Sequence, residues 1–397
     1  MENNIKDIKK NIMSSIRYFW VQLRRIFYSV LYCNSKIVSN KIIFDNFNGK
    51  GFGDNPRYIA ERLAEIGTYD IVWLVKDDNI ELPGYIRKVE NNTKAAFYEF
   101  STAKIWVDNV RNTIRPFKRK GQIYLQTWHG SFALKRVEGE ASNTLAKEYI
   151  RYAKNDGKNC DYILADSLVS EQLYREHFWL NSNTKVLQFG LPRNDILFKS
   201  EQYADISKRI KQNFKIPKED KLILYAPTFR DDLSIDGYKI DFAQVANALQ
   251  ERVGINCVIL IKLHPNVSEM SGFVSYNNNI IDVSKYPNIQ ELAIASDILI
   301  TDYSSSYYDF LILRKPVFLC ALDRDQYERQ RGLVEEYNML PFPYASSTEE
   351  LVECIKGFDC REYQENITSY IKRRPIYDKG NASIQVAKFI KSIIDLK

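Results

Sequence analysis

Short apolar runs alternate with longer amphipathic segments along most of this chain, and this alternation restricts the fold more than any other feature. Apolar residues at steps of three and four are typical of helices, as in Phe242–Val253 and Gln290–Ser296. Strands that alternate with helices predict an α/β protein with parallel, doubly wound sheets. The strands that we expect are Ile42–Phe47, Ile71–Val75, Ile105–Asp108, Ile123–Trp128, Tyr162–Ala165, Val186–Phe189, Leu222–Tyr225, Val258–Leu263, Ile298–Thr301 and Val317–Leu319.

The alternation of strands and helices is interrupted once, by the polar, Lys-rich stretch Phe198–Lys221, and then it restarts. A chain of 397 residues is long enough for about two domains of ordinary size. We therefore predict two Rossmann-like domains, residues 41–200 and residues 201–397, each with its own parallel sheet. Residues 1–40 precede the first strand and form a separate N-terminal segment.

The N-terminal segment is strongly basic, because residues 1–40 hold seven Lys and Arg against two acidic residues. Three arginines (Arg17, Arg24 and Arg25) interrupt every apolar stretch that is long enough to span a membrane. Two interpretations remain: an amphipathic helix on an anionic membrane surface, which we favour, or a helix that packs on its own domain. The apolar residues recur at steps of three and four, at Ile12, Ile16, Phe19, Leu23, Phe27 and Val30.

Several common ligand motifs are absent or weak. The six cysteines show no CxxC pairing, which is typical of reduced thiols in a cytosolic protein without a zinc site. No GxxxxGK[ST] occurs, and "GKGFGDN" (Gly49–Asn55) lacks the GxGxxG spacing, so we interpret it as a flexible turn that faces a cleft between the domains. The motif "DRD" (Asp323–Asp325) leaves a metal-bound nucleotide sugar as a minor alternative.

Polar and charged residues follow the expected strands at the point where each strand ends. His129 follows one strand in "QTWHGS", and His264 follows another in "KLHPN". Thr228 and Arg230 in "APTFRDD" and Arg193 in "GLPRND" repeat this placement. Open α/β sheets bind ligands at the carboxyl ends of their strands. A histidine there can act as a general base near neutral pH, or as a charged donor to phosphate.

The stretch "TDYSSS" places several hydroxyl groups between a strand and the helix that follows it. Ser304 and Ser305, with backbone N–H groups at the start of that helix, predict a cradle for an anion, most simply a diphosphate. Asp309 lies one turn further along the helix, where it could accept hydroxyl groups of a ribose or polyol. The positive charge opposite the diphosphate would come from Arg193, Arg230, Lys262 and His264.

The motifs "QTWHGS", "PRND", "LYAPTFRD", "KLHP", "SDILITDYSSSYYDFLILRKPV" and "RGL" occur in this order, and the match extends from about residue 42 to about residue 390. In this respect the chain resembles the CDP-glycerol glycerophosphotransferase family, the teichoic acid primases and polymerases. The resemblance implies a glycosyltransferase-B-like fold with two domains that face a cleft, the first for the acceptor and the second for the CDP-linked donor. It also implies chemistry without a metal or other cofactor, and peripheral, monotopic attachment to the cytoplasmic face of the cell membrane.

The resemblance also implies roles for individual residues. His129 matches the catalytic base, and His264 is a second catalytic candidate. Trp128, Gly130 and Ser131 lie on the acceptor side. The residues expected around the donor are Arg193, Thr228, Arg230, Lys262, His264, Ser304, Ser305 and Asp309.

We therefore expect transfer of glycerol phosphate, or a related polyol phosphate, from its CDP conjugate to a hydroxyl group, with release of CMP. The acceptor would be a lipid-linked glycan or a growing teichoic acid or capsule polymer. A metal-independent glycosyltransferase that uses a nucleotide sugar is the alternative. A third interpretation is a non-catalytic polyanion-binding protein at the membrane, which would have no need of His129. We expect no nucleic-acid partner.

Overall fold

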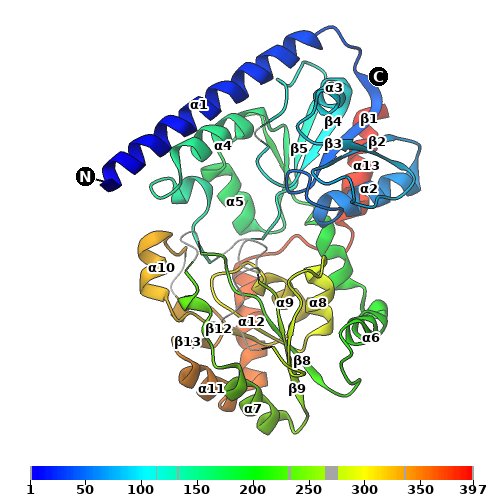
Figure 1. Ribbon diagram of the computed structural model, residues 1–397. Helices are drawn as coiled ribbons and strands as arrows, with labels where there is room; N and C mark the ends of the chain where they lie inside the picture. Colours follow the sequence, from blue (N-terminus) through cyan, green and yellow to red (C-terminus); the bar gives the residue numbers. More distant parts are fainter. Residues whose placement is uncertain are drawn as a thin grey trace. The chain divides into compact units, whose positions relative to one another are not determined.

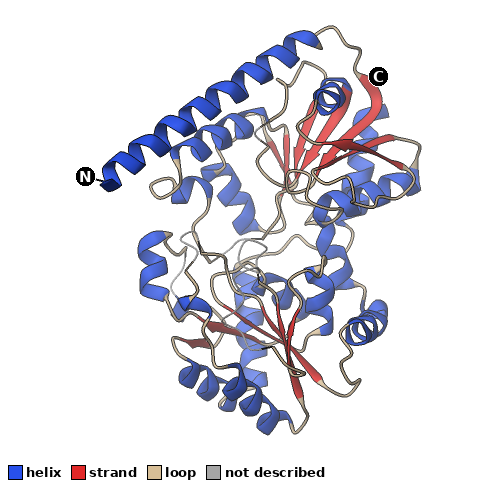
Figure 2. Cartoon of the chain, viewed as in Figure 1, coloured by secondary structure: helices blue, strands red, loops and turns tan. Residues whose placement is uncertain are grey.

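The computed structural model describes residues 2–112, 114–131, 134–230, 234–263, 276–334 and 337–395, with the backbone alone described for 2–15, 17 and 338. The chain divides into two compact units. Unit 1 comprises Met1–His129, Glu138–Arg193 and Tyr377–Lys397, and unit 2 comprises Gly130–Val137 and Asn194–Ile376. Each unit contains one parallel sheet with helices on both faces (Figure 2).

The sheet of unit 1 has seven parallel strands in the order β3-β2-β1-β4-β5-β6-β7. Ile42 in β1 pairs with Ile71 on one side and with Ile105 on the other. The strands are β1 (Val38–Asp45), β2 (Asp70–Val75), β3 (Ile86–Glu90), β4 (Ala103–Asp108), β5 (Ile123–Gln126), β6 (Tyr162–Leu164) and β7 (Lys185–Leu187). The helices are α1 (Glu2–Leu31), α2 (Asp54–Ile66), α3 (Lys94–Thr102), α4 (Lys147–Asn159), α5 (Leu168–His177) and α13 (Ala382–Asp395), with a short 3₁₀ helix η1 (Glu138–Ala141).

The core of unit 1 forms because its central strands are apolar on both faces, as buried parallel strands are. Phe44 and Trp73 from neighbouring strands stack with their ring centroids 5.6 Å apart, and both side chains are fully buried. The last helix of the chain, α13, returns to this unit and packs beside α2 (Figure 1), where Val386 and Ile390 enter the core.

The sheet of unit 2 has six parallel strands in the order β10-β9-β8-β11-β12-β13. The strands are β8 (Lys221–Tyr225), β9 (Cys257–Ile261), β10 (Ile280–Asp282), β11 (Ile298–Thr301), β12 (Val317–Cys320) and β13 (Tyr344–Ala345). The helices are α6 (Tyr203–Asn213), α7 (Phe242–Val253), α8 (Ile289–Ala295), α9 (Tyr307–Leu313), α10 (Arg324–Gln330), α11 (Thr348–Lys356) and α12 (Cys360–Arg373). Short 3₁₀ helices are η2 (Pro192–Phe198), η3 (Ser200–Gln202), η4 (Asp236–Tyr238) and η6 (Tyr337–Met339).

The prediction of an α/β protein with parallel, doubly wound sheets is confirmed, and all ten expected strands are present. Three further strands, β3, β10 and β13, were not predicted, and each lies at an edge of its sheet. Edge strands carry polar residues or are very short, so they lack the apolar run that marks a central strand. In β3, for example, Arg87 and Lys88 are exposed.

Most of the N-terminal segment forms one long helix, α1, that lies along unit 1 beside α3 and α4 (Figure 1), and its last residues, from Val38 on, already belong to β1. Its polar face is the one that contacts the unit. Arg25 is buried and its Nε donates to the carbonyl of Arg115 at 2.9 Å. Arg24 donates to Asn92 Oδ1 at 2.6 Å, and the ring of Tyr28 stacks on the ring of Phe97 in α3.

The opposite face of α1 exposes large apolar side chains to solvent. Within the described part of the chain, no helix is long and apolar enough to cross a membrane. The exposed fraction reaches 64% for Trp20 and 67% for Val30, which is unusual for apolar residues gathered on one helix. The exposed residues are Ile16, Phe19, Trp20, Leu23, Ile26, Phe27, Val30 and Leu31, and we call them the apolar face of α1.

Candidate functional site

In doubly wound sheets a ligand binds beyond the carboxyl ends of the strands, at the point where the strand order reverses. The order reverses between β1 and β4 in unit 1, and between β8 and β11 in unit 2. Asn109 directly follows β4, and His129 lies three residues after β5. Thr228 follows β8, and Ser304 follows β11. Candidate residues therefore lie beyond the strand ends near the reversal point in each unit.

His129 is held by a backbone carbonyl at the reversal point of unit 1. Its Nδ1 lies 2.6 Å from the carbonyl oxygen of Asn109. The side chain of Asn109 is itself fixed, because it donates to Asn46 Oδ1 at 2.9 Å and accepts from the N–H of Phe47 at 2.9 Å. A carbonyl can only accept, so Nδ1 carries the proton and Nε2 carries the lone pair of the neutral ring. His129 thus has the tautomer that a general base needs.

The residue before His129 has a strained backbone. Trp128 has φ of 53°, in the left-handed region that a bulky side chain rarely adopts. Its N–H donates to Gln126 Oε1 at 2.9 Å, and its carbonyl accepts from Asn55 Nδ2 at 3.0 Å. The indole ring lies against the imidazole of His129, with centroids 4.3 Å apart. Strain of this kind persists only where surrounding contacts hold it, and it is common at functional sites.

Arg193 belongs to the same cluster as His129. Its Nη1 donates to the carbonyl of His129 at 2.8 Å and to Asp54 Oδ2 at 3.0 Å. Its backbone N–H donates to Asn55 Oδ1 at 3.0 Å. Arg193 is buried, so the structure brings this predicted donor residue together with the predicted base, inside unit 1.

A buried network of charges lies behind the strand ends of unit 1. Arg115 forms ion pairs with Asp108 and Asp156, and Arg111 pairs with Asp156 at 3.2 Å. Burial raises the pKa of Asp45 to about 6, although the N–H of Gly49 and nearby positive charge oppose this shift. Burial also raises the pKa of Asp108 well above its usual range. The network holds the ends of β1 and β4, from which Asn109 extends.

In unit 2, a second buried cluster organises the loops after β8 and β11. Asp302 Oδ1 accepts from the N–H of Thr228 at 2.7 Å, and Asp302 Oδ2 lies 2.8 Å from Arg230 Nη2. Arg230 Nε donates to Asp323 Oδ2 at 2.6 Å, and Nη1 donates to the Thr228 carbonyl at 2.5 Å. The rings of Tyr303 and Tyr327 stack, and each lies 4.9 Å from the guanidinium. Arg230 therefore ties the two loops together.

Two buried hydroxyl groups of candidate residues have no hydrogen-bond partner in the part of the chain that the structure describes. Thr228 Oγ1 and Ser131 Oγ have no hydrogen-bond partner among the described residues. Gly130 lies so close to Ser305 that a Cβ on the glycine would be 3.2 Å from Ser305 Oγ. An unsatisfied buried hydroxyl costs about 1–3 kcal/mol, so such groups are expected where a ligand or ordered water completes the bonding. Ser304 Oγ accepts from the N–H of Ser306 at 3.2 Å.

The remaining predicted donor residues are placed as follows. Lys262 Nζ donates to the carbonyls of Ser284 and Tyr286 at 2.6 and 2.7 Å, and burial lowers the pKa of Lys262 to about 8. Asp309 is buried in α9 and accepts from Gln290 Nε2 at 3.1 Å. His264 lies outside the described residues. The helix α9 has only seven residues, so its dipole adds little to the predicted cradle.

Four residues of these clusters were not among the sequence candidates: Asp54, Asn55, Asn109 and Asp302. Asn109 and Asp302 directly follow strands, so the rule that found His129 would have found them too. Asp54 and Asn55 end the motif "GKGFGDN", but nothing in the sequence indicates that this motif contacts residues near positions 128 and 193.

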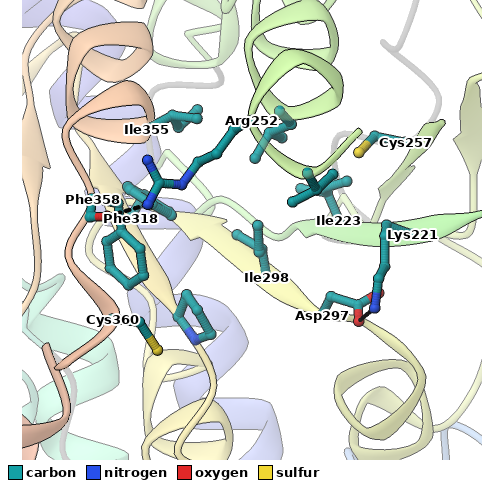
Figure 3. Close-up of a pocket in the computed structure, with 13 residues that line it drawn as sticks. Lys221, Ile223, Arg252, Cys257, Asp297, Ile298, Phe318, Ile355, Phe358 and Cys360 are labelled. Carbon is teal, nitrogen blue, oxygen red and sulfur yellow. Dashed lines mark hydrogen bonds and ion pairs between the residues drawn. The ribbon is translucent and has the colours of Figure 1, made fainter. Parts of the chain in front are cut away.

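A pocket of about 280 Å³ in unit 2 lies away from these clusters (Figure 3). Lys221, Cys257 and Ile298 in its wall are the first residues of β8, β9 and β11, so the pocket is at the amino ends of the strands. The rest of the wall is mostly apolar, and Arg252 at its side donates to the carbonyl of Lys356 at 2.6 Å. Its position excludes it as the site at the strand reversal. Among the described residues, no group of three or more His, Cys, Asp or Glu side chains could hold a metal ion.

Residues 26–392 match the family model described as CDP-Glycerol:Poly(glycerophosphate) glycerophosphotransferase. The chain belongs to this family. The family that the motifs indicated is therefore confirmed, and the predicted enzyme class is the class of this family.

Curated relatives are teichoic acid enzymes. The teichoic acid poly(glycerol phosphate) polymerase of Staphylococcus epidermidis is 33% identical over 88% of this chain, and this chain spans only 50% of that protein. The polymerase of Bacillus spizizenii is 30% identical over 96% of this chain and 99% of its own length. The teichoic acid glycerol-phosphate transferase of Staphylococcus aureus is 30% identical over 93% of this chain and 98% of its own length.

Solved structures agree with the sequence relatives. The wall teichoic acid polymerase TagF is 30% identical, with a TM-score of 0.80 over 98% of this chain and 99% of that chain. A variant of TagF soaked with CDPG gives a TM-score of 0.82 over 97% of this chain and 98% of that chain. The predicted glycosyltransferase-B-like fold class is thus confirmed.

Proposed function

We propose that this protein transfers glycerol phosphate from CDP-glycerol to a hydroxyl group of a teichoic acid chain and releases CMP. Membership of the family across residues 26–392 gives the reaction class. The observation that supports the chemistry most directly is the contact between His129 Nδ1 and the Asn109 carbonyl. This contact presents Nε2 as a proton acceptor at the reversal point of a Rossmann-like sheet.

The proposed reaction has one chemical step. His129 Nε2 takes the proton from the acceptor hydroxyl, and the oxygen attacks the β-phosphorus of CDP-glycerol. The bond between that phosphorus and the bridging oxygen breaks, and CMP leaves with the electron pair. The Asn109 carbonyl would stabilise the imidazolium that forms, because it accepts from Nδ1–H. Phosphoryl transfer depends mainly on alignment and charge neutralisation, so no covalent intermediate is required.

On the donor side, we assign the buried hydroxyls of unit 2 to the diphosphate. Thr228 Oγ1 and Ser131 Oγ lack protein partners among the described residues, and phosphate oxygens would satisfy them. This assignment moves Ser131 from the acceptor side, where the sequence resemblance had placed it, to the donor side. Ser304 and Ser305 would add hydroxyl donors from the loop after β11. Positive charge would come from Arg193, Lys262 and His264, without a metal ion.

Other predicted residues receive more specific roles. Arg230 contacts two carboxylates and a carbonyl, so we assign it to holding the loops of Thr228 and Asp302 and not to the phosphate itself. Asp309 would face the polyol or ribose hydroxyls. Trp128 and Gly130, on either side of His129, would border the acceptor.

We also propose that the acceptor is lipid-linked and that α1 rests on the cytoplasmic face of the cell membrane. The apolar face of α1 supports this proposal, since eight large apolar side chains on one helix are exposed. Insertion of each large side chain would contribute about 1.5–3 kcal/mol. Arg24 and Arg25 contact unit 1, so the binding would depend more on apolar insertion than on these two charges.

The experiment incubates the protein with CDP-glycerol and a lipid-linked teichoic acid primer, and measures CMP release beside glycerol phosphate incorporation. We expect the two products in equal amounts. A parallel reaction with UDP- and CDP-linked sugars tests the alternative glycosyltransferase. Turnover of a nucleotide sugar in place of CDP-glycerol would contradict the proposal, and binding without any CMP release would favour a non-catalytic polyanion-binding protein.

A further inference from the structure

The motif "GKGFGDN" has no role in the proposed reaction, yet its last two residues contact Arg193 and Trp128, the residue before His129. We propose that Asn55 is a positioning residue that holds the catalytic base and Arg193 in one fixed arrangement. This inference rests on the proposed function, because it concerns the same base. All of the contacts that carry it lie within unit 1.

Asn55 joins two loops that are far apart in the chain. Its Nδ2 donates to the carbonyl of Trp128 at 3.0 Å, and its Oδ1 accepts from the backbone N–H of Arg193 at 3.0 Å. The residue is fully buried at the start of α2. Because both ends of the amide are used, one side chain sets the distance between the loop after β5 and the loop after β7.

The contact with Trp128 opposes a specific relaxation. At φ of 53° the backbone of Trp128 is strained, and the carbonyl that Asn55 holds belongs to the peptide that leads into His129. Release of this carbonyl would let the peptide turn toward the ordinary region of φ. The imidazole would then leave the Asn109 carbonyl, and the carbonyl of His129 would leave Arg193 Nη1.

The motif itself is anchored to the sheet. Gly49 has φ of +85°, and a Cβ there would lie 2.7 Å from the backbone nitrogen of Lys76. Its N–H donates to Asp45 Oδ1 at 2.7 Å, at the end of β1. Asp54, next to Asn55, pairs with Arg193 Nη1 at 3.0 Å. The glycine turn therefore delivers the Asp54–Asn55 pair from the end of β1 to the two loops.

The test compares Asn55→Leu and the smaller change Asn55→Ser with a matched control, Gln122→Leu. Gln122 is also a buried amide of unit 1, and it bonds three backbone groups (Phe100 and Ala103 carbonyls and the Arg119 N–H) at the start of β5. The Gln122 variant removes a similar number of bonds but leaves the His129 loop intact. We expect all three variants to lose thermal stability.

The turnover number kcat should distinguish the two Asn55 variants from the Gln122 control. A misplacement of about 1 Å at a reacting group can cost about 10²-fold in rate, so both Asn55 variants should lose roughly that factor in kcat while Gln122→Leu keeps its kcat. The decisive readout is a double-variant cycle with His129→Ala. If Asn55 acts through His129, then Asn55→Ser should cost little further turnover once the imidazole is gone.

Two outcomes would overturn the proposal: a folded Asn55→Ser protein with normal kcat, or an effect of Asn55→Ser that multiplies fully with that of His129→Ala. Failure of the proposed function is distinguishable from either, because it would appear first as normal turnover in His129→Ala alone.

Discussion

Asp323, from a motif that resembles a metal-binding DxD, forms an ion pair with Arg230: its Oδ2 lies 2.6 Å from Arg230 Nε. Its Oδ1 accepts from Tyr303 Oη at 2.9 Å. Both oxygens are thus used inside unit 2, and the pair holds Arg230 against Asp302. Asp323 in the "DRD" motif therefore has a structural role, because it holds Arg230 in the loops of unit 2. These contacts give no support to a role of Asp323 as a metal ligand.

We therefore expect Asp323→Asn to lower the thermal midpoint and the affinity for CDP-glycerol, because a buried guanidinium loses a charged partner. Activity of the unchanged protein should persist in EDTA. The matched control is Asp325→Asn, which changes the exposed carboxylate of the same motif and should have little effect. Loss of turnover in EDTA that magnesium or manganese restores would contradict this assignment.

We expect His129 and His264 to have different roles: His129 as the general base, and His264 as a contact to the CDP-glycerol donor. His129→Ala should lower kcat by roughly 10²–10⁴-fold, the usual contribution of general-base catalysis, with little change in donor affinity. His264→Ala should weaken binding of CDP-glycerol, since a phosphate contact is lost in ground state and transition state alike. Calorimetry with CDP-glycerol and saturating turnover measure the two effects. If His129→Ala abolished donor binding while His264→Ala kept binding and lost turnover, the two roles would be reversed.

The pH dependence of turnover provides a separate check on His129. Only the neutral imidazole accepts a proton, so kcat/KM should fall as the pH drops through the ordinary range of histidine. Asn109 holds the ring through a backbone carbonyl, which no side-chain substitution removes. If His129 is the base, the fall of kcat/KM at low pH should disappear in His129→Ala and persist in His264→Ala. A limb that survives in His129→Ala would assign the proton transfer to another group.

The apolar face of α1 should determine vesicle binding. Trp20→Ser with Phe27→Ser should release the protein from anionic vesicles, while turnover of a water-soluble acceptor should stay normal. The matched control changes two exposed apolar residues elsewhere on unit 1, Ile66→Ser with Tyr85→Ser. Flotation of both proteins with vesicles, at low and high salt, measures the difference. Equal binding of both double variants would place the attachment elsewhere.

A second basic segment, "RPFKRK" at residues 115–120, is a poor candidate for an alternative attachment site. Arg115, its first residue, is buried and paired with Asp108 and Asp156. Lys118 pairs with Asp161, and Arg119 donates to the carbonyl of Ser35 at 2.8 Å. Most of the positive charge of the segment is thus used within unit 1.

Lys262 should make the stability of the protein depend on alkaline pH. Burial lowers its pKa in the folded protein from 10.5 to about 8, so the unfolded chain binds more protons between these values. The free energy of unfolding should therefore gain a stabilising contribution as the pH rises from about 8 to about 10.5. Lys262→Met should lack this contribution. Urea unfolding of both proteins at several pH values tests it, and parallel pH dependences would contradict it.

Local patterns predicted the central strands and the placement of polar residues after them. Ile42–Phe44 and Ile298–Ile300 are short apolar runs, and burial on both faces of a sheet requires such a run. The position of His129 and Thr228 after such runs was enough to identify both as candidates. The ends of the strands were less accurate: the run Ile123–Trp128 continues past β5, which ends at Gln126.

The sequence by itself determined the class of fold and the family, because these follow from local periodicity and from motifs in order. It also supplied a set of candidate site residues. Only the tertiary structure decided which groups meet. Asn55 and Arg193 are 138 residues apart, and their hydrogen bond exists because the ends of parallel strands meet at one edge of a sheet. The same holds for α1, whose periodicity predicted an apolar face but not its direction. That direction depends on Arg25, which fits a buried carbonyl of unit 1 and so turns Trp20 and Phe27 outward.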